Sequence, residues 1–83
     1  MKVEVTNISK HGFWILAKDK EYFLSKKDFP WFVDKTIREI SDVKALSDTH
    51  LYWEDLDIDL SLDMIENPQR YPLQDKINQV ETI

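Results

Sequence analysis

Six oxygen-bearing side chains between positions 55 and 66 have a spacing that could bind a calcium ion. They stand at positions 1, 3, 5, 7, 9 and 12 of an EF-hand loop and are Asp55, Asp57, Asp59, Ser61, Asp63 and Glu66. That loop needs a glycine at its sixth position for a sharp turn, and this chain has Leu60 there. The loop would also expose Leu56 and Ile58 to water. We therefore predict no metal and no cofactor at this segment.

The same segment alternates in a way that is typical of a β-strand. From position 56 to position 64 the even residues are apolar and the odd residues are aspartate or serine. Successive side chains of a strand point to opposite faces, so one row would face the core and the acidic row would face water. We predict an extended segment over residues 51–60. Ser61 would then cap a helical turn over 62–66, which Asn67 and Pro68 would end.

The negative charge of the chain is concentrated in this segment. The formal net charge is −5, and residues 54–66 hold six acidic residues and no basic one, so the rest of the chain sums to +1. Binding of nucleic acid through a basic surface is disfavoured, because no row of cations is available for phosphates. A basic protein partner is permitted.

These observations favour a non-enzymatic protein-interaction module. The candidate partner-binding residues are Asp55, Asp57, Asp59, Trp53 and Trp31. The alternative is a metal-binding protein or a small enzyme that uses the acidic row 55–66. The two hypotheses differ in whether the carboxylates converge into a pocket or spread along a flat face.

The two histidines do not match the pattern of a zinc site or of an acid–base catalytic site. His11 and His50 lack the short spacing of paired zinc ligands, and acid–base catalysis would need one of them held against a carboxylate in a cleft. We assign His11 to a hairpin turn and His50 to the start of a strand. No catalytic residue is predicted.

The first third of the chain predicts a three-stranded antiparallel meander over residues 1–9, 13–17 and 21–25, with turns at 10–12 and 18–20. Gly12 is the only glycine, and we expect it to hold a positive φ at the first turn. Residues 13–17 are apolar at every position, which is typical of a central strand covered on both faces.

The middle of the chain predicts one helix and a return to strands. Residues 34–43 form the helix, with Asp34 as its cap and with Val33, Ile37 and Ile40 facing the core. Residues 43–46 form a short strand. The expected fold is α+β, in the order β-β-β-α-β-β followed by a helical turn, with a single domain over 1–73 and a flexible tail over 74–83.

The length and composition of the chain indicate a single domain in the cytoplasm. A chain of 83 residues makes one domain, and it has no cysteine and no apolar stretch long enough to span a membrane, so we expect a cytoplasmic protein. Trp14, Trp31 and Trp53 cannot all be buried easily in so small a domain. One helix also cannot readily cover a second face of residues 13–17. Both points suggest an apolar patch used for dimerisation or partner binding.

Two stretches resemble a known family. FLSKKDFPWF, at 23–32, and HLYWEDLDIDLSLDMIENPQRYPL, at 50–73, look like the bacterial family catalogued as domain of unknown function 2442, and the likeness extends over residues 1–73. It rests on the opening strands, the entry to the helix, and the element from Trp53 to Ser61. The resemblance implies a small α+β protein with no established catalytic residue, an antitoxin-like role, and a cap at Ser61.

Overall fold

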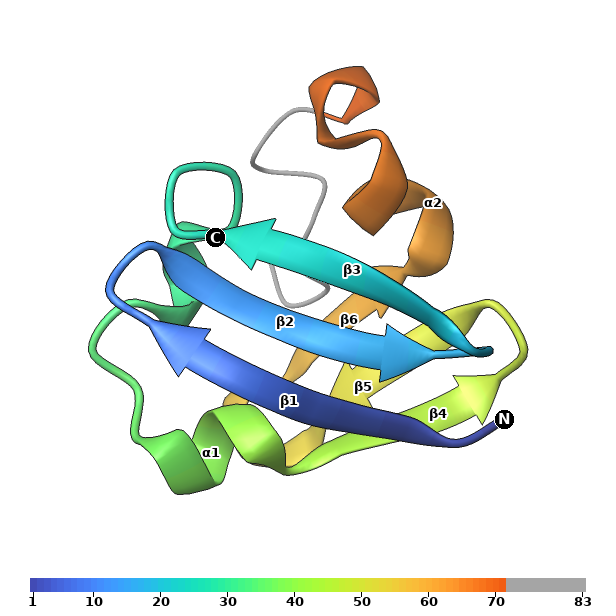
Figure 1. Ribbon diagram of the computed structural model, residues 1–83, viewed down its shortest axis with the longest axis horizontal. Helices are drawn as coiled ribbons and strands as arrows, with labels where there is room; N and C mark the ends of the chain where they lie inside the picture. The colour runs from blue at the N-terminus through green and yellow to red at the C-terminus, as the bar shows by residue number, and fades with distance from the viewer. Residues whose placement is uncertain (72–83) are drawn as a thin grey trace, which may run out of the picture.

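The computed structural model of the protein describes residues 1–71 (Figure 1). It consists of two antiparallel three-stranded sheets, β1-β2-β3 and β4-β5-β6, with two short α-helices. The sheets lie one in front of the other, with the first sheet toward the viewer in Figure 1. The predicted α+β fold is confirmed. The predicted tail over 74–83 lies outside the described residues.

The first sheet is the predicted meander. Strand β1 covers Val3–Ser9, β2 covers Gly12–Ala17 and β3 covers Lys20–Ser25, and β2 pairs with both neighbours. The turn between β2 and β3 contains Lys18 and Asp19, which both have positive φ, at 55° and 61°. Two consecutive residues in this conformation form the type of turn whose twist matches a hairpin.

Gly12 begins β2 opposite Ser25 of β3. Its φ is 150°, so the predicted positive φ is confirmed. A β-carbon at this position would lie 2.2 Å from the carbonyl oxygen of Leu24, which is far inside van der Waals contact. The close approach of two strands is therefore a second reason for glycine here.

The second sheet follows a 3₁₀ turn at Pro30–Phe32 and helix α1 at Ile37–Ser41. Its strands are β4 at Val43–Ser47, β5 at His50–Trp53 and β6 at Ile58–Ser61. The prediction of one extended segment over 51–60 is wrong, because a 3₁₀ turn at Glu54–Leu56 splits it into a hairpin. The second sheet therefore has one strand more than predicted.

Helix α2, at Leu62–Glu66, begins as predicted. The Ser61 hydroxyl accepts a hydrogen bond from the backbone N–H of Met64 at 3.1 Å. Asn67 ends the helix, and a 3₁₀ turn follows at Pro68–Arg70. The serine thus satisfies one of the amide groups that a helix start leaves without a partner.

Helix α1 begins later than predicted. Its cap is Thr36 and not Asp34: the Thr36 hydroxyl accepts from the Glu39 N–H at 3.0 Å, and the Glu39 carboxylate accepts from the Thr36 N–H at 2.9 Å. This reciprocal pair is a capping box. The late start turns Ile37 outward, 70% exposed, and leaves Val33 before the helix, so of the predicted inward row only Ile40 is buried.

The hydrophobic core lies between the two sheets. Its largest fully buried side chains come from both sheets and from Phe29; they are Trp53, Phe29, Ile15, Leu24, Leu51, Ile58 and Leu60. The Trp53 ring packs edge-on against Phe32 and Phe13, with centroids 4.9 and 6.3 Å away. No helix in residues 1–71 is long and apolar enough to cross a membrane.

Candidate functional site

The predicted acidic row is divided among three elements. Asp55 lies in the 3₁₀ turn, Asp57 follows it with a φ of 53°, and Asp59 lies on β6. Asp63 and Glu66 belong to α2. The carboxylates therefore do not form one continuous strand face.

The positions of the apolar residues change where the acidic row is interrupted, at residues 54–57. Leu51 and Trp53 are buried at odd positions, whereas Ile58 and Leu60 are buried at even positions. One uninterrupted strand would place these two pairs on opposite faces. The loop of residues 54–57 resets the alternation, so both strands of the hairpin present their apolar side chains to the same core.

Cations from distant parts of the chain pair with several of the acidic residues. The Lys44 ammonium lies 2.6 Å from Glu54, and Lys20 pairs with Glu66 of α2. The hydrogen bond from Lys44 lowers the pKa of Glu54, and the hydrogen bond to Glu66 raises the pKa of Lys20. Sequence reasoning missed these cations because Lys20 is separated from Glu66 by 46 positions.

The side chain of Asp63 forms hydrogen bonds with residues at and just after the C-terminal end of its own helix, α2. Its carboxylate accepts hydrogen bonds from the Tyr71 hydroxyl and, at 2.9 Å, from the Asn67 amide, and Arg70 lies 3.7 Å away. The bond from Tyr71, then that from Asn67, lowers the pKa of Asp63. These contacts tie the turn at Pro68–Arg70 to α2, so Asp63 has a structural role.

Tyr52 lies on the outer side of the second sheet, beside Asp57 and Asp59. Its hydroxyl donates to Asp57 at 3.3 Å, and its cross-strand neighbour is Asp59. Loss of water around the phenol, followed by the negative charge of Asp57, raises the pKa of Tyr52. Asp55 and Asp57 are exposed and have no cation within ion-pair distance among the described residues.

His50 and Asp59 form the one arrangement in residues 1–71 that approaches acid–base geometry. The imidazole Nε2 lies 3.2 Å from Oδ1 of Asp59, an oxygen that has no well-aligned hydrogen bond. Ser61 is the cross-strand neighbour of His50, but its hydroxyl caps α2. Within the same residues, no three histidine, aspartate or glutamate side chains come together in a group that could hold a metal ion.

The two tryptophans predicted to bind a partner differ in accessibility. Trp53 is completely buried in the core, so this prediction is wrong for Trp53: a partner could not contact it without opening the fold. Trp31 is half-buried and packs against the core, with its ring 6.5 Å from that of Phe29.

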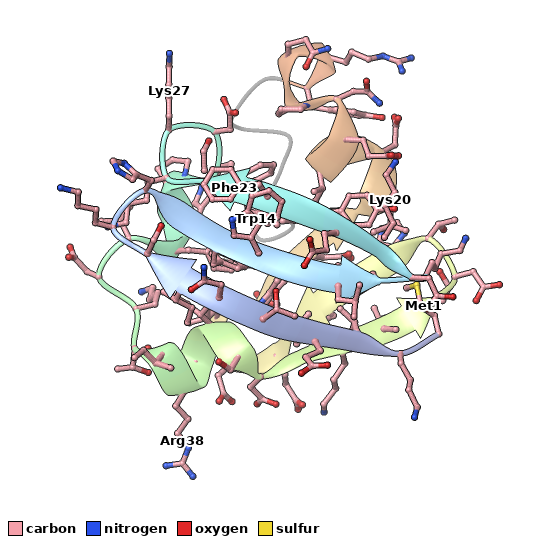
Figure 2. The ribbon with its side chains drawn as sticks, in the orientation of Figure 1. Met1, Trp14, Lys20, Phe23, Lys27 and Arg38 are labelled. Atoms are coloured by element: carbon pink, nitrogen blue, oxygen red, sulfur yellow. The ribbon has the colours of Figure 1, made fainter. Side chains whose placement is uncertain are left out.

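The outer face of the first sheet carries an apolar patch of Trp14, Leu16 and Phe23, which we call the sheet-face patch. Trp14 and Phe23 are cross-strand neighbours whose ring centroids lie 5.1 Å apart (Figure 2). Trp14 is 38% exposed, and Leu16 and Phe23 are half-buried. No element of the part that the structure describes covers this face, so the prediction that residues 13–17 are covered on both sides is wrong there.

Comparison with known proteins identifies the family. Residues 2–71 match the family described as a protein of unknown function, DUF2442. The chain belongs to this family. No curated protein and no solved structure matches the chain.

The match to DUF2442 confirms the resemblance seen in the sequence. It spans every strand and helix described above, so both sheets and the sheet-face patch belong to the region that defines the family. The family's description names no activity.

Proposed function

We propose that the protein is a non-enzymatic protein-interaction module whose contact surface is the outer face of the first sheet. The observation that carries the proposal is the pairing of exposed Trp14 with half-buried Phe23 on a sheet face with no cover among residues 1–71. Aromatic side chains of this kind dominate the binding energy of protein interfaces. A face-covering partner would remove them from water.

The contacts of the polar side chains support a non-enzymatic role. Ser61 caps a helix, Asp63 holds the turn that follows it, and Glu54 and Glu66 form ion pairs. Each of these groups already has a partner within the fold. The His50–Asp59 pair remains, but no hydroxyl group within residues 1–71 is hydrogen-bonded to either of its side chains.

Contact with a basic protein, in an antitoxin-like manner, is a second candidate. Asp55 and Asp57 support it, because both are exposed at the tip of the β5–β6 hairpin. Charges of this kind mainly affect the rate and salt dependence of association.

Photo-crosslinking tests the proposed surface directly. A benzoylphenylalanine at position 14 should form adducts with a partner in cells of the source organism, and mass spectrometry would identify them. The matched control carries the same group at position 37, because Ile37 is 70% exposed but lies on α1, away from the sheet face. Adducts that form equally from both positions, or from neither, would reject the sheet face as the contact surface.

A further inference from the structure

We draw no further inference here: the strongest candidate, the sheet-face patch on the outer face of the first sheet, carries none, because exposed Lys2 and Lys18 lie at the same end of that face as Glu4 and Glu21 and nothing in residues 1–71 shows what covers it.

Discussion

The indole N–H of Trp53 donates a buried hydrogen bond to the backbone carbonyl of Ile40 at 2.8 Å. Trp53 ends β5, and Ile40 lies in the last turn of α1, so this bond joins the second sheet to the helix that precedes it. The helix is too short to be stable alone. Its position therefore depends on this bond, on its capping box, and on the burial of the Ile40 side chain.

Trp53→Phe should destabilise the domain by about 2–4 kcal/mol, because it leaves a buried carbonyl without its donor and opens a cavity. Urea unfolding followed by circular dichroism measures the change. Trp31→Phe is the control: that indole is half-buried and makes no hydrogen bond within residues 1–71, so its loss should cost less than about 1.5 kcal/mol. Equal costs for the two variants would show that the Trp53 hydrogen bond contributes little.

Gly12→Ala should destabilise the domain by about 1–3 kcal/mol, because the new β-carbon would meet the Leu24 carbonyl and the backbone φ is unfavourable for alanine. Thermal unfolding measures the effect. Thr6→Ala, at an exposed position of β1, should change stability by no more than about 0.5 kcal/mol. An alanine at position 12 without measurable cost would mean that the strands separate freely at this end of the sheet.

Ser61→Ala should destabilise the domain by about 1 kcal/mol, because the Met64 amide would lose its acceptor at the start of α2. Ser61→Asp provides the matched rescue, since its carboxylate can accept the same hydrogen bond and also favours a helix N-terminus. The free energy of unfolding should recover largely in the aspartate variant. Equal losses in both variants would assign the effect to packing instead of capping.

The sequence predicts the first sheet well because its signals are local. Alternation, a single glycine and two short turns determine the β1–β2–β3 meander. The β5–β6 hairpin was missed because the aspartates continue the alternation through the turn, which hides the change in apolar parity between Trp53 and Ile58. The apolar residues move from odd positions (Leu51, Trp53) to even positions (Leu56, Ile58), and this change is the sequence signal that marks the turn.

The ion pairs of two acidic residues, Glu54 and Glu66, could not be predicted from the sequence. Lys44 lies 10 positions from Glu54, and Lys20 lies 46 positions from Glu66, so neither cation can be assigned to its partner before the fold is known. The apolar patch could be anticipated, because residues 13–17 are apolar on both faces. Which of the two faces remains open depends on where the second sheet packs.

Stability should fall as the pH drops below about 4.5. The pKa values of Glu54 and Asp63 lie below their ordinary values of 4.5 and 3.8, owing mainly to hydrogen bonds from Lys44 and Tyr71. In the unfolded chain these carboxyls take up protons at higher pH than in the folded chain. Their contribution is therefore fully present above the unfolded pKa and is lost as the pH falls through the folded one.

Urea midpoints measured between pH 7 and pH 2.5 check this expectation. Asp63→Asn should flatten the decline, because the group with the lowered pKa is gone. The Lys44–Glu54 part is exposed and should also shrink in high salt. A pH profile that is identical for the parent and for Asp63→Asn would remove Asp63 from this account.

Asp55→Asn combined with Asp57→Asn should leave the fold intact, with a melting temperature within about 2 °C of the parent. Asparagine tolerates the left-handed backbone at position 57, and its amide oxygen can still accept from Tyr52. Asp57→Val is the contrasting variant: a β-branched residue is strained at this φ and should lower the melting temperature clearly.

The same double variant tests the second candidate function. If Asp55 and Asp57 contact a basic protein, their replacement should slow the capture of a lysine-rich peptide, most strongly at low salt, since exposed charges act mainly on association rate. Trp14→Ser should not alter that capture, because the sheet-face patch and the hairpin tip belong to different sheets. Peptide binding that is indifferent to both aspartates would leave the sheet-face patch as the one supported contact surface.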